Sequence, residues 1–88
     1  MDIEFDPAKD AANIARRGIS LAFGAVVIAK NAGVVEDRRR DYGEVRMLAF
    51  AEVRGVWFAC AYTMRGEVYR IISVHRVRER EVAKWLAR

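Results

Sequence analysis

Three strand-like runs follow one another in the second half of this chain, and a short turn separates each from the next. The runs are Glu44–Val53, Val56–Thr63 and Val68–Val74. The connections are Arg54-Gly55 and Met64–Glu67, and both contain the glycine that a hairpin turn favours at a positive φ. Connections this short join antiparallel neighbours only. The sequence therefore predicts an antiparallel β-sheet meander at the centre of the fold.

The residues before the meander predict a short strand and a first helix. Alternation of polar and apolar residues favours a strand over Asp2–Asp6. Asp6 and Pro7 pair a helix N-cap with proline at the first helical position, so a helix is expected over Ala8–Arg17. Gly18 is expected to end this helix. Its expected apolar side consists of Ala8, Ala11, Ala12, Ile14 and Ala15.

Three further segments complete the predicted order of elements. Leu21–Lys30 is so uniformly apolar that it fits a buried helix and a buried strand equally well. Gly33–Glu36 is expected to be a strand, and Arg76–Ala87 a C-terminal helix. The apolar face of that helix is formed by Val82, Trp85 and Leu86. The order predicts an α+β fold, and residues 1–88 are expected to form a single domain because they are too few for a second core.

The composition argues against several classes of protein. The single cysteine, Cys60, cannot form an internal disulfide, and its apolar neighbours predict a buried, unreactive thiol. One histidine and one cysteine cannot build a zinc site without suitably spaced carboxylates, so neither a metal nor a cofactor is expected. Residues 1–10 lack the apolar core of a signal peptide, and the longest apolar run, Leu21–Ala29, is too short to cross a bilayer. A cytoplasmic protein that does not enter a membrane is expected.

The positive charge is concentrated at the C-terminal end. Residues 1–64 contain nine basic and nine acidic residues, whereas residues 65–88 contain seven basic and three acidic ones. The net charge of +4 therefore arises entirely after residue 64. Thirteen of the sixteen basic residues are arginines, which bind phosphate in a bidentate manner. This bias favours a nucleic acid as the binding partner.

The last predicted strand and its turn carry the residues best suited to RNA chemistry. Metal-free RNA cleavage needs a base for the 2′-hydroxyl and cations for the phosphate. Arg65 and Arg70 can hold the phosphate and stabilise the charge of a phosphorane. His75 can exchange protons near neutral pH, and Glu67 is the second candidate base. A regular period of two places Arg70 and His75 on opposite faces of the strand.

The same residues also have structural interpretations. His75 can be a surface or hydrogen-bonding residue at a strand end. Arg70 can pair across the sheet with Glu44 or Glu52. Both interpretations stay open at the level of the sequence.

Two other groups of arginines are equally ambiguous. Arg39 lies in the charged segment 37–41, which is either a solvated loop or a contact surface for a phosphate backbone. Arg76 begins a stretch in which arginines and glutamates alternate, a pattern typical of a solvated helix face.

Ordered motifs along the chain resemble those of the BrnT toxins of type II toxin–antitoxin systems, compact relatives of the RelE/ParE fold. The N-terminal matches are Phe5-Asp6 with Lys9 and Asn13, and then Gly18-Ile19-Ser20. The central match is Asp37 with Tyr42-Gly43-Glu44 and Arg46. The two most specific matches are Tyr62-Thr63 with Arg65-Gly66, and Arg70-Ile71-Ile72-Ser73.

The resemblance implies a ribosome-independent endoribonuclease that inhibits translation by cutting RNA, and the residues above predict that its cleavage is metal-independent. It implies neutralisation by a BrnA-like antitoxin, with operator DNA bound only through the toxin–antitoxin complex. Leu21–Lys30 is then expected to be a helix, because the family carries two helices before its sheet. Arg65 and Arg70 occupy positions of family arginines tied to toxicity. The expected RNA-binding residues are Arg39, Arg46 and Arg76.

The chain departs from the family pattern at two positions. Arg17 stands where the family usually has a histidine, and His75 stands where it usually has an arginine. These departures leave an alternative: a family member with weakened catalysis that acts as an antitoxin-binding or nucleic-acid-binding module. A stand-alone nucleic-acid-binding domain is a third possibility, but neither a helix-turn-helix nor an aromatic RNA-binding motif is recognisable.

Overall fold

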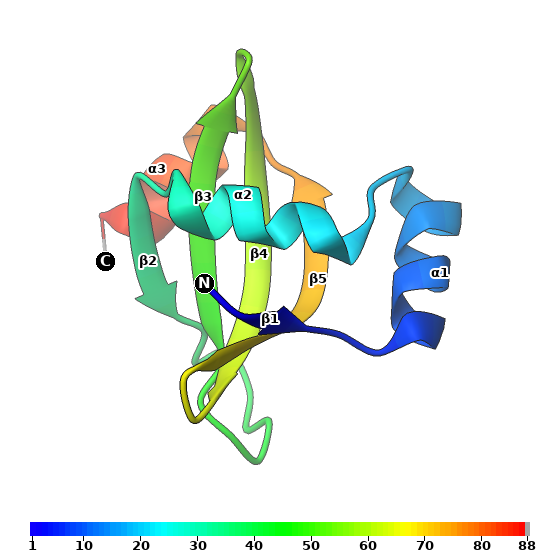
Figure 1. The fold of residues 1–88 in the computed structure, drawn as a ribbon. Helices are drawn as coiled ribbons and strands as arrows, with labels where there is room; N and C mark the ends of the chain where they lie inside the picture. Colours follow the sequence, from blue (N-terminus) through cyan, green and yellow to red (C-terminus); the bar gives the residue numbers. More distant parts are fainter. Residues whose placement is uncertain (88) are drawn as a thin grey trace.

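The computed structural model describes residues 1–87, so Arg88, the last residue of the expected domain, lies outside the described residues. A five-stranded sheet with the order β1-β5-β4-β3-β2 forms its middle layer. Helices lie on both sides of this sheet (Figure 1). The elements are β1 (Ile3–Glu4), α1 (Pro7–Arg17), a 3-10 turn η1 (Leu21–Phe23), α2 (Gly24–Ala29), β2 (Gly33–Glu36), β3 (Met47–Val53), β4 (Val56–Arg65), β5 (Val68–Arg76) and α3 (Glu79–Leu86).

The α+β fold is confirmed, with one addition to the sheet. The antiparallel pairs β3–β4 and β4–β5 form the expected meander, and β2 extends it by pairing antiparallel with β3. Strand β1 pairs with β5 in parallel, with Ile3 opposite Tyr69 and Glu4 opposite Arg70, so the sheet is mixed. The N-terminal strand therefore lies beside the strand in which the sequence places the candidate catalytic residues.

Two hydrophobic cores lie on opposite faces of the sheet. On one face, η1 and α2 pack on a cluster that includes Leu21, Cys60 and Ile71. On the other face, Val82 and Trp85 of α3 pack on the neighbouring sheet residues. These sheet residues are Leu48, Phe50, Ala59 and Ala61. We call the two sides the α2 face and the α3 face.

A β-bulge in β5 overturns the expected alternation of side chains. Ala61 of β4 pairs with Ser73, and the next residue, Tyr62, pairs with Ile71, so Ile72 is the extra residue of β5. The pairing partners continue as Thr63 with Arg70 and Ala59 with His75. Partners in an antiparallel ladder point to the same face, so Arg70 and His75 both lie on the α3 face. A regular period of two had placed them on opposite faces.

Helix α1 has the expected ends, but it is attached in a different way. Asp6 accepts a hydrogen bond from the Ala8 amide, and Gly18 ends the helix at φ 70°. The expected apolar side is wrong, because Ala11, Ala12, Ala15 and Ile14 are exposed. The buried residue of α1 is Asn13, whose Nδ2 donates to the carbonyls of Ile19 at 2.8 Å and Val74 at 3.0 Å. A polar clamp therefore holds this helix against β5.

The apolar segment after Gly18 is helical, as the family resemblance implies. Ser20 caps η1 by accepting from the Ala22 amide. Asp10 of α1 also accepts from the Leu21 amide at 2.7 Å, which fixes the entry to this segment. Gly24 begins α2 so close to the sheet that a Cβ there would lie 3.0 Å from Cys60 Sγ. The helix therefore approaches β4 at a glycine, which has no side chain to collide with the sheet.

The strands of the hairpin extend further than the sequence predicts, and the last helix begins later. The Val77 amide donates to the Trp57 carbonyl at 3.0 Å, which continues the β4–β5 pairing beyond Arg76. The chain therefore enters α3 only at Glu79 rather than at Arg76. At the other end of the sheet, β3 begins at Met47 rather than Glu44.

No single helix among residues 1–87 is long and apolar enough to cross a membrane. Helix α1 and the segment Leu21–Ala29 meet the length and composition criteria only as a pair, and that pair is bent by 92°.

Cys60 is fully buried, and burial raises the pKa of its thiol to about 12. The thiol is therefore protonated and unreactive, as its neighbours in the sequence predict.

Replacement of Ile71 by alanine tests the core between the sheet and α2. Ile71 is 1% exposed, so Ile71→Ala is expected to lower the free energy of unfolding by about 2–5 kcal/mol. The matched control is Ile14→Ala on α1, because Ile14 is 46% exposed and its replacement is expected to cost less than about 0.5 kcal/mol. Urea denaturation measures both, and equal effects would contradict this description of the core.

Candidate nucleic-acid interface

The structure places the four expected catalytic residues at three separate levels of the β4–β5 hairpin. Arg65 and Glu67 lie at its turn, where Arg65 pairs with Val68. His75 pairs with Ala59, six residues along β4 from Arg65, which corresponds to about 20 Å of strand. Arg70 lies between them, opposite Thr63. The turn residues and His75 therefore do not meet around one phosphate.

Arg70 is oriented by a carboxylate that sequence analysis did not single out. Its Nη1 donates to Glu4 Oε2 at 2.7 Å, and the side chains of Arg70 and Glu4 are 27% and 40% exposed. The alternative of a pairing with Glu44 or Glu52 is wrong, because Glu4 of β1 supplies the carboxylate that pairs with Arg70. The pair leaves part of the Arg70 side chain open to solvent. The ion pair with Glu4 holds this exposed part of the arginine in position.

Thr63 and Arg46 lie at the same height along the strands as Arg70, on the two neighbouring segments of the sheet. Thr63 Oγ1 donates to the Val45 carbonyl at 2.7 Å, so the segment before β3 runs beside β4 at this point. Met47 pairs with Tyr62, which places Arg46 next to Thr63. The Arg46 guanidinium lies 3.7 Å from the centroid of the Tyr42 ring, a cation–π contact that restricts it.

Asp37 organises the loop that carries Arg39 and Tyr42. Its side chain is 1% exposed and accepts from Arg39 Nε and Nη2, both at 2.9 Å, and from the Tyr42 hydroxyl at 2.8 Å. The hydrogen bonds from Arg39 hold the pKa of this carboxyl well below its usual range. The Arg39 guanidinium also lies 5.0 Å from the centroid of a Trp85 ring. Arg39 is therefore a fixed, partly exposed cation at the edge of α3.

Together these residues form a band on the α3 face that we call the arginine row. It consists of Arg46, Thr63, Arg70 and, two residues further along β4, Arg65. Ala61 is the last residue of β4 in the hydrophobic cluster under α3, and the row begins beyond it at Thr63. The loop 37–46 and the β4–β5 turn project from this same end of the sheet (Figure 1). The row can therefore meet an elongated polyanion along the end of the sheet.

His75 has a more enclosed position under α3. It lines a small cavity of about 80 Å³ together with Arg39, Glu81 and Trp85, and its Nδ1 is buried with no hydrogen-bond partner among residues 1–87. Burial lowers the pKa of His75, as do the charges of Arg17 and Arg39, while Glu81 opposes this shift. The imidazole is therefore neutral at pH 7.

Arg76 lies on the α2 face, away from the arginine row. It pairs with Phe58, and its guanidinium lies 5.8 Å from the centroid of the Phe58 ring. Arg76 Nη1 donates to the Arg17 carbonyl at 3.2 Å, at the C-terminal end of α1. A cation is favourable there because it compensates the exposed carbonyls of the helix end.

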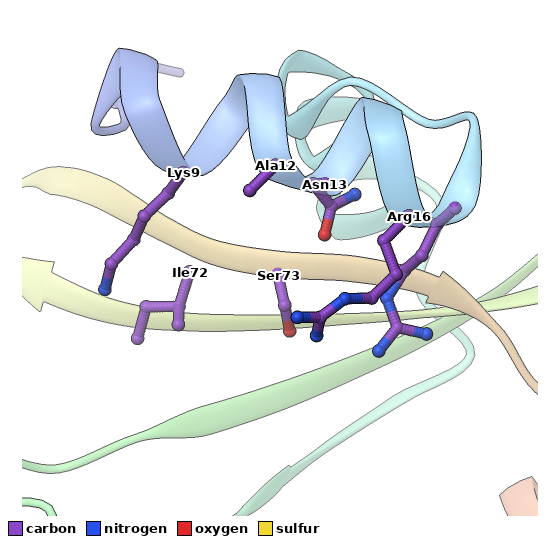
Figure 2. Close-up of a pocket in the computed structure, with 7 residues that line it drawn as sticks. Lys9, Ala12, Asn13, Arg16, Ile72 and Ser73 are labelled. Carbon is purple, nitrogen blue, oxygen red and sulfur yellow. The ribbon is translucent and has the colours of Figure 1, made fainter.

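A second group of cations, which sequence analysis did not propose as a site, surrounds a cavity of about 150 Å³ between α1 and β5. Lys9, Arg16 and Arg17 come from α1, and Ser73 comes from β5. Figure 2 shows the long side chains of Lys9 and Arg16 extending from the helix toward the strand. The available signal in the sequence was the spacing of Lys9 and Arg16, two helical turns apart on one face.

Comparison with known families gives one match. A family model described as the ribonuclease toxin BrnT of type II toxin–antitoxin systems matches residues 5–81. The matched range contains the arginine row and the cations of α1. No curated protein matches the chain. Among residues 1–87, no group of three or more His, Cys, Asp or Glu side chains is arranged to hold a metal ion.

The position of His75 predicts how stability depends on pH. The pKa of His75 is lower in the folded protein than its ordinary value of 6.5, so the unfolded chain takes up the proton first as the pH falls. Stability from this group is complete above about pH 6.5 and is lost as the pH falls below it. The melting temperature of the wild type is therefore expected to fall more between pH 7 and pH 5 than that of His75→Gln. Identical pH profiles would contradict the enclosed position of His75.

Proposed function

This chain belongs to the BrnT family of ribonuclease toxins from type II toxin–antitoxin systems, and we propose that it is a metal-independent, ribosome-independent endoribonuclease that inhibits translation. Membership implies an RNA substrate and an antitoxin partner. The description of the family as ribonucleases favours this function over that of a binding module without catalysis. The remaining question is which residues hold and cut the RNA.

The arginine row is the observation that carries the proposed site. Arg70 of β5 and Arg46, the residue before β3, lie on either side of β4, so their backbones are about 10 Å apart on one face. Glu4 orients the first and the ring of Tyr42 restricts the second, so both cations are largely ordered before RNA binds. Preorganised cations stabilise the developing charge of a phosphorane without a cost for reorganisation. In the proposal, Arg70 and Arg65 hold the scissile phosphate, and Arg46 and Arg39 hold neighbouring parts of the strand.

The proposal assigns proton transfer to Glu67. The Glu67 side chain is exposed at the turn beside Arg65, where it can reach a ribose hydroxyl. The 2′-oxygen would attack phosphorus as Glu67 takes its proton, and the bond to the 5′-oxygen would break. The products are a 2′,3′-cyclic phosphate and a 5′-hydroxyl that receives a proton from water. His75 is the alternative base, but its Nδ1 is buried. Its pairing partner in β4 is four residues from the partner of Arg70, so the two levels are about 13 Å apart along the strand.

The family membership also supports a proposal for the cellular setting. We infer that the 88 residues act as one domain in the cytoplasm and that a BrnA-like antitoxin neutralises it. Operator DNA would then be bound only through the toxin–antitoxin complex, and the fold would be related to that of the RelE/ParE toxins. Arg76 is kept as a candidate contact for RNA at the far end of β5, beside α1.

Replacement of Arg70 tests the proposed site. Arg70→Ala is expected to slow RNA cleavage at least about 100-fold and to abolish growth arrest, because the scissile phosphate loses its best-ordered cation. Glu4 remains partly exposed to water, so the variant is expected to fold. Circular dichroism and binding to the antitoxin check this. The matched control is Arg54→Ala in the distant β3–β4 turn, which should remain toxic. Full toxicity of Arg70→Ala would show that the site lies elsewhere.

Chelation tests the proposed independence from metal ions. Cleavage of single-stranded RNA by the purified protein, without ribosomes, is expected to continue unchanged in excess EDTA, because arginines supply the charge stabilisation. The products are expected to carry 2′,3′-cyclic phosphate ends, which mass spectrometry identifies. Loss of cleavage in EDTA, with recovery on addition of Mg²⁺, would refute metal-free chemistry.

A further inference from the structure

The cavity between α1 and β5 is open because the edge of β5 is only partly covered. Strand β1 pairs with β5 at Tyr69 and Arg70 alone. Beyond that point α1 takes the place of a neighbouring strand, and the clamp from Asn13 to the Val74 carbonyl holds it there. The bulge at Ile72 lies in this same stretch, and Ile72 and Ser73 form the floor of the cavity (Figure 2). A rigid strand and a clamped helix therefore define its shape.

The cavity is lined by cations and by no carboxylate. Lys9, Arg16 and Arg17 border it, and none of the three has a salt bridge among residues 1–87. All three side chains are exposed to solvent. Ser73 adds a hydroxyl that makes no hydrogen bond within the described chain. Three unneutralised cations around a concave, polar site attract an anion, and the available N–H and O–H donors match the oxygens of a phosphate.

The cavity lies beside the arginine row along β5. Ser73 pairs with Ala61 and Arg70 pairs with Thr63, so the two residues are separated by two rungs of the ladder, about 7 Å. Both lie on the α3 face at the same edge of the sheet. A single strand of RNA held at Arg70 can therefore continue along β5 to the cations of α1.

We propose that the α1–β5 cavity is a second phosphate-binding subsite, in which Arg16, Arg17 and Lys9 bind a backbone phosphate next to the scissile one. This inference rests on the proposed function, because it takes RNA as the ligand. It deepens that function by giving the enzyme a contact outside the cleavage site. The subsite fixes the direction in which the strand leaves Arg70, along β5 toward the cations of α1.

The experiment measures binding without cleavage. A fluorescein-labelled single-stranded 2′-fluoro RNA lacks the attacking hydroxyl and cannot be cut, and its affinity is measured by fluorescence anisotropy at several salt concentrations. Arg16→Gln/Arg17→Gln is expected to weaken binding about 10-fold or more, since it removes charge-assisted hydrogen bonds. The slope of log affinity against log salt is expected to become shallower by about 0.7 for each phosphate that the variant no longer neutralises.

Two controls isolate the effect of position from the effect of charge. Lys30→Gln/Arg54→Gln removes the same number of charges at a separate cavity on the α2 face and is expected to change affinity less than about 2-fold. Arg16→Lys/Arg17→Lys keeps the charges and is expected to restore the salt slope of the wild type. Wild-type affinity and slope in Arg16→Gln/Arg17→Gln, or no binding of the oligomer by the wild type, would overturn the subsite.

Two further readouts separate this proposal from its premises. Arg70→Ala tests the cleavage site by toxicity, whereas the α1 variants are read by binding alone, so either proposal can fail without the other.

A free phosphate ion could bind the same N–H and O–H donors as a backbone phosphate of RNA. Inorganic phosphate is therefore titrated into the protein while the backbone amide of Ser73 is followed by NMR. Weak or absent binding at millimolar concentrations is expected. Saturation below about 1 mM, a free energy near −4 kcal/mol, would reassign the cavity to a free phosphate ligand.

Discussion

The pairing of β4 with both of its neighbours is the constraint on which the rest of this structure depends. β4 forms antiparallel ladders with β3 and β5, and its alternate residues contribute to both hydrophobic cores. The small residues Ala59, Cys60 and Ala61 allow close approach of α3 on one face and α2 on the other. Because both layers pack on the same few residues, the position of each helix follows from the register of this strand.

The bulge in β5 links that register to the proposed chemistry. Without the extra residue, Arg70 and His75 would lie on opposite faces of the sheet. With it, Ile71 and Val74 both enter the core under α2, while Arg70, Ser73 and His75 share the α3 face. The same irregularity lies where α1 replaces β1 as the neighbour of β5. One inserted residue therefore accounts for the shared face of Arg70, Ser73 and His75 and for part of the cavity beside it.

Carboxylates and aromatic rings orient three arginines of this protein. Glu4 holds Arg70, Asp37 holds Arg39, and Tyr42 lies against Arg46. These contacts neutralise only part of the charge and leave donor groups open to solvent. They also restrict side chains that would otherwise lose conformational entropy on binding a ligand. The cations of α1 are different, because the clamp of Asn13 positions their helix while the side chains themselves form no salt bridge within residues 1–87.

The sequence by itself determined the α+β class, the caps of α1, the meander and the concentration of arginines near its last hairpin, because these depend on short-range patterns of polarity, glycine and charge. Its motifs also indicated the family that comparison then showed. Tertiary structure alone decided that α1 is attached through Asn13 and not through its alanines, and that Glu4 pairs with Arg70 across 66 positions of the chain. It also decided that Lys9, Arg16 and Arg17 border the same strand as Arg70. A bulge or a parallel pairing between distant segments leaves no periodic signal, since its energy comes from contacts that exist only once the chain has folded.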